Sequence, residues 1–428
     1  MTDRPMTPAV GGERLVPVPD DIARDYLLLA LRLDQRVPGL VDGYYGPASL
    51  KAQVDMESIA SPIRLAADAA RLRERIAGEV GDSGRRRWLD RQLVALEALA
   101  RVQAGESIGY LDLVERLFDF RPTRHPDDEF RSAGGELEAL LSGSGPLAER
   151  LARWDATFTI PPDRLPAVSE WLVDRFRERA EHLFGLPAGE GLTVGFVRNQ
   201  PWSGYNWYDG GRRSRVDLNL DLPIRAADLI HVVAHETYPG HHLEHAWKEA
   251  GLVDAQGRTE ASVLLINTPE CLISEGLADL GHRFASPEAD EPALLAELFE
   301  RAGLPIANDP VAAREAAESS ARIAVVRRSL GAIAVNAALM RHADGAAHED
   351  VLRYLIDVGQ MAPERAAKRL EFIEHPLWRT YVFVYSEGEA LLRRWMDRVP
   401  PDDQPARFGR LLHEAPTPSG IAAELAAG

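Results

Sequence analysis

The sequence predicts a mainly α-helical protein with one small antiparallel β-sheet. Apolar residues recur at three- to four-residue spacing through most of the chain, which is the pattern of amphipathic helices. Alternating apolar and polar residues occur together only at 192–197 and 215–220, which predicts two short strands. With 428 residues, 45% hydrophobic and 27% charged, the chain has the composition of a globular protein with a large core.

The expected elements fall into three regions along the chain. Residues 1–20 contain repeated Pro and Gly without apolar periodicity, so we expect a flexible N-terminal arm. The second region, 21–185, reads as an N-terminal helical subdomain with helices at 22–33, 66–80, 86–103, 110–118 and 166–183. In the third region, 190–428, the two strands precede helices at 229–235, 261–265, 269–284, 292–302, 310–341, 349–359, 362–373 and 377–399. We expect the two subdomains to form the walls of a cleft.

Charge and cysteine content exclude several classes of protein. The net charge of −17 disfavours nucleic acid or an anionic membrane as partner. No apolar run approaches the ~18 residues of a membrane span. A single cysteine, Cys271, and an N-terminus without an apolar leader favour a cytoplasmic location.

A histidine cluster is the strongest chemical signal in the sequence. Five of the twelve histidines fall between residues 231 and 245, and imidazole is the commonest protein ligand for zinc. His-Glu at 235–236 is followed by Gly-His at 240–241, with four residues between Glu236 and His241, where the helix of zinc proteases has two. Pro239 lacks an N–H and crowds the carbonyl of His235, so the helix is expected to break or bulge there.

The break decides which histidine joins His235 as a ligand. We favour His241, because a bulge returns it to the face of His235. A regular helix would instead bring His242, seven residues on, to that face. On the preferred interpretation His242 affects substrate handling or stability, and His231, one turn before His235, supports the site without ligating. A solvated helix end without metal is the alternative.

A second motif supplies acidic partners for the histidines. Glu275 lies in the apolar stretch 272–278, where a buried carboxylate needs a compensating charge, so we predict it to be the third metal ligand. Asp279, one turn further, is placed to accept a hydrogen bond from a ligating histidine. Gly276 permits the close approach of a neighbouring helix. Glu236 adjoins the first ligand and is the candidate general base.

These two motifs resemble those of the bacterial domain-of-unknown-function 885 family, which are gluzincin-like metallopeptidases related in architecture to helical carboxypeptidases. The resemblance covers roughly residues 195–395 and includes a C-terminal Tyr-x-x-Gly at 385–388. Members place Pro-Gly-Gln a few residues before that motif, whereas this chain has His-Pro-Leu-Trp at 375–378. The resemblance implies zinc-dependent peptide hydrolysis.

The sequence therefore predicts a hydrolase with one Zn²⁺ per chain that cleaves a peptide or small amide substrate. Tyr385 is the first choice to stabilise the oxyanion and Tyr381 the second. The strand at 215–220 is a candidate edge for pairing with substrate, and the aromatic turn 202–208 either lines the substrate pocket or packs on the sheet. Three alternatives stay open: a non-peptide amidase, a non-haem iron enzyme on the same ligands, and a non-catalytic metal-binding or partner-binding helical protein. The oligomeric state is not predicted.

Overall fold

The computed structural model describes residues 16–200 and 202–427 and confirms a mainly helical fold, with 66% of residues in helices and 7% in strands. Most of the expected N-terminal arm, residues 1–15, lies outside the described residues, and residues 16–20 run without helix into α1. The first helix begins at Asp21 because the side chain of Asp20 accepts a hydrogen bond from the amide of Ala23, which caps its N-terminus.

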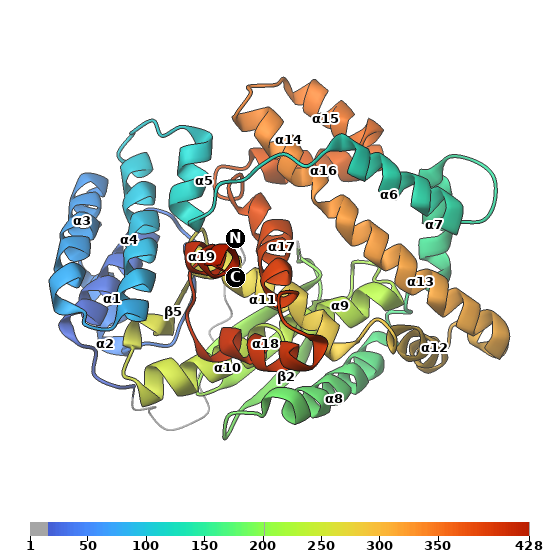
Figure 1. The fold of residues 1–428 in the computed structure, drawn as a ribbon, viewed down its shortest axis with the longest axis horizontal. Helices are drawn as coiled ribbons and strands as arrows, with labels where there is room; N and C mark the ends of the chain where they lie inside the picture. Colours follow the sequence, from blue (N-terminus) through green and yellow to red (C-terminus); the bar gives the residue numbers. More distant parts are fainter. Residues whose placement is uncertain (1–15, 201, 428) are drawn as a thin grey trace.

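The helices of the N-terminal half lie in three places (Figure 1). Helices α1 to α5 stand together at one side of the molecule, whereas α6 and α7 run beside α13, and α8 packs on α9 and α11. The bounds are α1 Asp21–Asp34, α2 Ala48–Met56, α3 Pro62–Glu79, α4 Ser83–Gln103, α5 Tyr110–Phe118, α6 Asp127–Leu140, α7 Leu147–Phe158 and α8 Leu165–Phe184.

The larger sheet has three strands, β2 Gly191–Val197, β3 Gly204–Gly210 and β4 Arg213–Asn219, in the spatial order β2-β4-β3. The expected antiparallel pairing occurs between β3 and β4, but β2 and β4, the two strands predicted from sequence, run parallel. The reason is β3, an aromatic segment that the sequence reading assigned to a turn. Because β3 returns the chain before β4 begins, β4 enters between its neighbours in the direction of β2.

A second, two-stranded sheet joins the two halves of the chain. Strand β1, Val41–Tyr44, pairs antiparallel with β5, Val263–Leu265. The helix expected at 261–265 is wrong, because this segment forms a 3₁₀ turn followed by β5. Runs of four and three residues are too short to show the alternation of a strand. Their pairing fixes the loop after α1 against the segment that leads into α11.

The C-terminal half is a succession of helices. They are α9 Ala226–Glu236, α10 His241–Lys248, a π-helical segment Glu249–Ala255, α11 Pro269–Ala285, α12 Glu291–Arg301, α13 Pro310–Gly331, α14 Ile333–His342, α15 His348–Asp357, α16 Pro363–Glu374, α17 Val384–Met396, α18 Gln404–His413 and α19 Pro418–Ala427, with short 3₁₀ turns at Thr259–Ser262, Pro305–Asn308, Tyr381–Phe383 and Pro401–Asp403.

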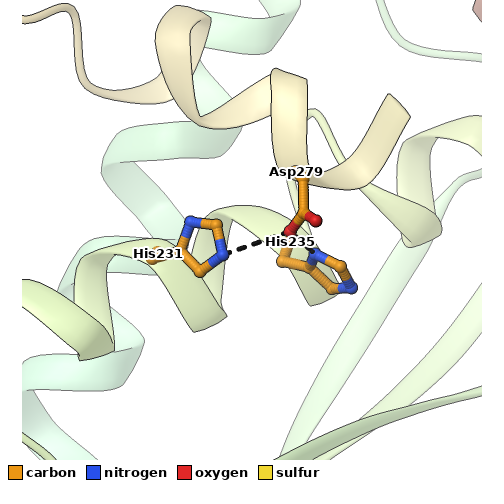
Figure 2. A group of neighbouring side chains, drawn as sticks. All are labelled: His231, His235 and Asp279. Carbon is orange, nitrogen blue, oxygen red and sulfur yellow. Dashed lines mark hydrogen bonds and ion pairs between the residues drawn. The ribbon is translucent and has the colours of Figure 1, made fainter. Parts of the chain in front are cut away.

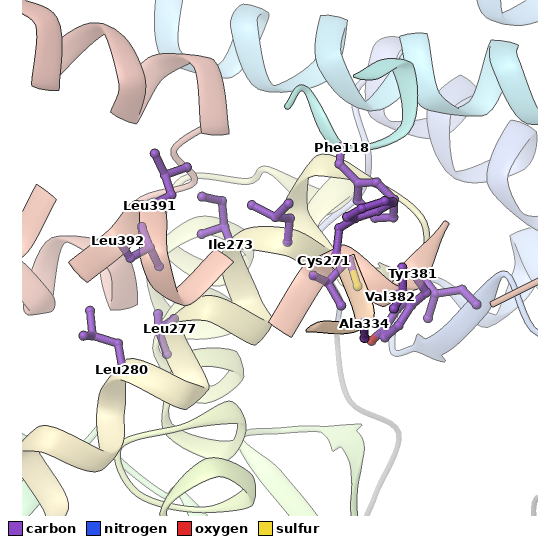
Figure 3. Close-up of a cluster of buried hydrophobic side chains, with 14 of the residues drawn as sticks. Phe118, Cys271, Ile273, Leu277, Leu280, Ala334, Tyr381, Val382, Leu391 and Leu392 are labelled. Carbon is purple, nitrogen blue, oxygen red and sulfur yellow. The ribbon is translucent and has the colours of Figure 1, made fainter. Parts of the chain in front are cut away.

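Helix α11 lies at the centre of the core. Fourteen of its seventeen residues are buried, so it has no solvated face. Its apolar side chains pack against α17 and α5 (Figure 3). The backbones of α11 and α17 touch where Gly276 meets Gly388, since a Cβ on Gly276 would lie 2.4 Å from the carbonyl carbon of Gly388. The close helix approach expected at Gly276 is confirmed.

The hydrophobic core is continuous across the expected boundary at residues 185–190. One cluster of buried side chains extends from Ile22 in α1 to Ile421 in α19. Within the described residues, one helical stretch, Pro310–His342, is long and apolar enough to cross a membrane by length and composition, and 56% of its most apolar window is buried in the protein. Such burial is typical of a core helix.

Candidate metal centre

The predicted break in the histidine segment is present. Helix α9 ends at Glu236 and α10 begins at His241, with a cis peptide bond before Pro239 in the intervening turn. The turn folds back on α9, because the amide of Gly240 donates to the carbonyl of Ala234 at 3.1 Å. A Cβ on Gly240 would lie 1.9 Å from the carbonyl oxygen of His235, so only glycine fits this position.

The break brings His241 beside His235, and α11 places Glu275 opposite both. Their rings stand perpendicular with centroids 4.7 Å apart. Oε2 of Glu275 lies 3.4 Å from Nε2 of His235 and 3.8 Å from Nε2 of His241. The three donor atoms all lie within 4.8 Å of one another, which is the arrangement expected of metal ligands.

The carboxylate of Glu275 is paired on one side only. Its Oε1 accepts a hydrogen bond from the hydroxyl of Tyr381 at 2.6 Å. Its Oε2 is buried and has no hydrogen-bond partner among the described residues. A buried oxygen of this kind is costly unless a cation or proton satisfies it. Burial raises the pKa of Glu275, but the neighbouring imidazoles of His235 and His241 outweigh that effect and lower it to about 2.

Asp279 orients His235 from the next turn of α11 (Figure 2). Its Oδ1 lies 2.9 Å from Nδ1 of His235 and 3.2 Å from Nε2 of His231. Burial raises the pKa of Asp279, but its bonds to the two histidines lower it well below the usual range. With Nδ1 of His235 committed to Asp279, Nε2 is the nitrogen left to bind a metal. His231 contacts the site through Asp279 and through the ring of His235, with centroids 5.9 Å apart.

His241 is oriented by a second group that the sequence reading missed. Oγ of Ser274 donates to Oε2 of Glu244 at 2.5 Å and lies 3.3 Å from Nδ1 of His241, so this oxygen accepts the Nδ1 proton. Lys248 neutralises Glu244 through a bond of 2.7 Å. The sequence feature that could have revealed this group is Glu244, which lies one turn after His241 in α10. Nε2 of His241 is thereby directed at Glu275.

Glu236 lies in the wall of a large cavity next to these three residues. Burial raises the pKa of its carboxyl, which suits a group that accepts and returns a proton. The two tyrosines differ in their contacts. Tyr381 is committed to Glu275, whereas Tyr385 lines the cavity with 42% of its surface exposed and makes no hydrogen bond to the described residues. Their rings are 5.7 Å apart.

His242 faces away from this centre. Its Nε2 lies 2.9 Å from Oε2 of Glu190 and its Nδ1 lies 2.8 Å from Oγ of Ser214. Glu190 also accepts hydrogen bonds from Tyr238 at 2.6 Å and Arg177 at 2.6 Å. His242 therefore ties α10 to the sheet and is not near enough to Glu275 to join it.

The cavity has a volume of about 1160 Å³ and is lined by both halves of the chain. Residues of α1, β1, α4 and α5 line it together with His235, Glu236, Glu275 and the two tyrosines. The sequence expectation that 215–220 offers an edge for substrate is wrong, because β4 is the central strand and both of its edges are paired. The edge strand on the cavity side is β3, whose aromatic residues line the cavity.

Comparison with known proteins bears on the fold of this chain and not on its chemistry. Neither a protein-family profile nor a curated protein matches the chain. A crystal structure described as a "putative lipoprotein" from Colwellia psychrerythraea is similar with a TM-score of 0.51 and 15% identity, over 86% of this chain and 68% of that one. Another, a "putative lipoprotein of unknown function" from Shewanella oneidensis, aligns with a TM-score of 0.43 and 11% identity over 95% and 73% of the two chains. The first likeness shows a shared fold.

Proposed function

We propose that this protein is a zinc-dependent hydrolase that cleaves peptide bonds in short peptides. The observation that carries the proposal is the buried Oε2 of Glu275, which has no hydrogen-bond partner among the described residues and faces Nε2 of both His235 and His241. Two imidazoles and one carboxylate suit zinc, and three protein ligands leave one coordination position for water or substrate. Glu236 in the adjoining wall favours catalysis over a structural site, because a structural site needs no base.

In this proposal each residue has one task in amide hydrolysis. His235, His241 and Glu275 would hold the zinc ion, which when bound would supply polarisation of the substrate carbonyl and acidification of water. Glu236 accepts a proton from the attacking water at its carboxylate and delivers it to the leaving amine. The hydroxyl of Tyr385 donates to the substrate oxygen as negative charge develops there.

The cavity favours a short substrate. Ligand sites for small molecules have volumes of roughly 300–1,000 Å³, and this cavity, at about 1160 Å³, lies just above that range. It accommodates a peptide of a few residues. Its enclosure by helices of both halves leaves less room for a folded protein chain.

The first experiment measures metal and activity in one preparation. Protein purified without added metal should contain about one zinc per chain, and a chelator should abolish cleavage of a mixed peptide library analysed by mass. Glu236→Gln should retain zinc and lose at least ~10²-fold in turnover, because the amide cannot accept the proton. Iron in place of zinc, or full turnover in the zinc-loaded Glu236→Gln protein, would contradict the proposal.

A further inference from the structure

Three aromatic rings stand in a row on the cavity wall beside the general base. Trp202 precedes β3, and Tyr205 and Trp207 lie in it; we refer to them as the aromatic row. Ring centroids of Trp202 and Tyr205 are 5.5 Å apart, and those of Tyr205 and Trp207 are 4.4 Å apart. All three rings are partly exposed and all three line the cavity.

Strand β3 contacts Glu236, the residue proposed as the base. Asn206 donates from Nδ2 to the backbone oxygen of Glu236 at 2.7 Å. A Cβ on Gly204 would lie 3.3 Å from Cγ of Glu236, so the strand touches the glutamate side chain directly. Tyr205 lies between these two contacts, and burial, Asp42 and the charges of Glu236 and Glu275 all raise its pKa. The aromatic row and Glu236 line the same cavity.

The polar atoms of two of these rings are already occupied. The hydroxyl of Tyr205 donates to the carboxylate of Asp42, and Nε1 of Trp207 donates to Oδ2 of Asp217 at 2.9 Å. The rings therefore offer a substrate mainly carbon surface. The N-terminal half contributes aliphatic side chains to the cavity wall as well, including Val37, Leu99, Val102, Leu113 and Leu117.

We infer that the substrate carries an aromatic or large aliphatic residue beside the cleaved bond, with its side chain against the aromatic row. The inference rests on the proposed peptidase function. Burial of such a side chain between the rings and the aliphatic wall is favourable, and paired aromatic rings add to it. An acidic residue at the same place is disfavoured, because the carboxylates of Asp42 and Glu236 flank Tyr205.

A peptide series tests this selectivity. Zinc-loaded protein is given peptides identical except for one residue, Phe, Leu, Gly, Lys or Glu, flanked by alanines, and kcat/KM is measured for cleavage on either side of that residue. Phe and Leu should exceed Gly by at least ~10-fold, as expected for filling an apolar pocket, and Glu should be the poorest. A preference for Lys or Glu, or equal rates for Phe and Gly, would overturn the inference.

Variants assign the preference to the aromatic row. Trp202→Ala removes a ring without a side-chain hydrogen bond and should reduce the ratio of Phe to Gly cleavage by about 3- to 10-fold. Tyr205→Ala should do the same, whereas Tyr205→Phe keeps the ring and should keep the ratio. Trp171→Ala is the matched control, since that half-buried indole on α8 stacks with Arg301 outside the cavity. An unchanged ratio in both ring deletions would contradict the assignment.

A binding measurement separates failure of this inference from failure of the proposed function. Calorimetry of the Phe and Gly peptides with zinc-loaded Glu236→Gln protein requires no turnover. Tighter binding of the Phe peptide by at least ~10-fold, reduced in the Trp202→Ala background, supports the inference. Equal binding of the two peptides overturns the inference even when wild type cleaves them. Absence of cleavage by wild type counts against the proposed function.

Discussion

At the scale of single residues, adjacent histidines have opposite environments. His241 points at Glu275, whereas His242 points at Glu190 and Ser214, because neighbours in a helix differ by about 100°. The sequence could predict this division, since Pro239 precludes a regular helix. It could not predict Ser274 and Glu244, because their contact with His241 depends on how α11 crosses α10.

Substitution of the two histidines should separate metal binding from stability. His241→Ala should lose most of the zinc affinity, because it removes one of three protein ligands. His242→Ala should retain zinc but lower the free energy of unfolding by about 1–3 kcal/mol, since it removes the buried hydrogen bonds of His242 with Glu190 and Ser214. Titration with zinc against a competing chelator, together with urea unfolding of the metal-free proteins, measures both. Loss of tight zinc binding in His242→Ala alone would contradict the assignment.

Glu190 should give the protein a defined sensitivity to acid. Burial raises its pKa, but hydrogen bonds from His242, Tyr238 and Arg177 outweigh that effect and lower it to about 2. A carboxyl whose pKa is lower in the folded than in the unfolded chain stabilises the fold above the unfolded value of about 4.5, and the contribution is lost as pH falls toward 2.

The measurement compares wild type with Glu190→Gln in urea at several pH values. At pH 7 the variant should be less stable by about 1–3 kcal/mol. The difference should shrink between pH 4.5 and pH 2, because wild type then loses the same charge. A difference that stays constant over this range would show that the charge of Glu190 contributes nothing.

At the scale of elements, the sequence predicted helices more reliably than strands. Long amphipathic patterns located α1, α4 and α8 within a few residues. Strand β3 was missed because Gly204, Tyr205 and Trp207 are also typical of loops, and only pairing with β4 makes them a strand. The parallel pairing of β2 and β4 is likewise a property of the sheet and not of either segment.

The close contact of α11 and α17 at Gly276 and Gly388 can be tested by substitution. Gly276→Ala should destabilise the protein by about 1–3 kcal/mol, because the new methyl group meets the backbone of Gly388 and must push the helices apart. Since α11 carries Glu275 and α17 carries Tyr385, cleavage should fall as well. Thermal unfolding and peptide cleavage measure the two effects.

Gly409→Ala in α18 is the matched control. Nothing lies within 4 Å of a Cβ placed on that glycine, so alanine should stabilise the helix by about 0.5–1 kcal/mol. If Gly276→Ala stabilised the protein as Gly409→Ala is expected to, contact between Gly276 and Gly388 would not set the distance between α11 and α17.

At the scale of the whole molecule, the metal should stabilise the fold. The three proposed ligands come from α9, α10 and α11, which are brought together only in the folded chain. A ligand that binds the native state alone adds RT ln(1 + [L]/Kd), or about 2.7 kcal/mol at one hundred times Kd. Zinc should therefore raise the midpoint of urea unfolding.

Glu275→Gln tests whether this stabilisation arises at the proposed centre. The amide keeps the size of the side chain and can still accept a hydrogen bond from Tyr381, but it removes the charge that compensates a cation. The variant should show little stabilisation by added zinc. Equal midpoint shifts in the variant and in wild type would place the stabilising metal elsewhere in the protein.

The turn at residues 237–240 is a place where higher helix propensity would harm the proposed site. In an uninterrupted helix six residues advance about 9 Å along the axis and rotate by about 240°, which would carry His241 to the far side from His235. Substitutions of Pro239 and Gly240 by alanine favour that continuous helix on propensity alone. A protein engineered for a more regular helix here would gain local helical order, but the imidazoles of His235 and His241 would no longer lie side by side.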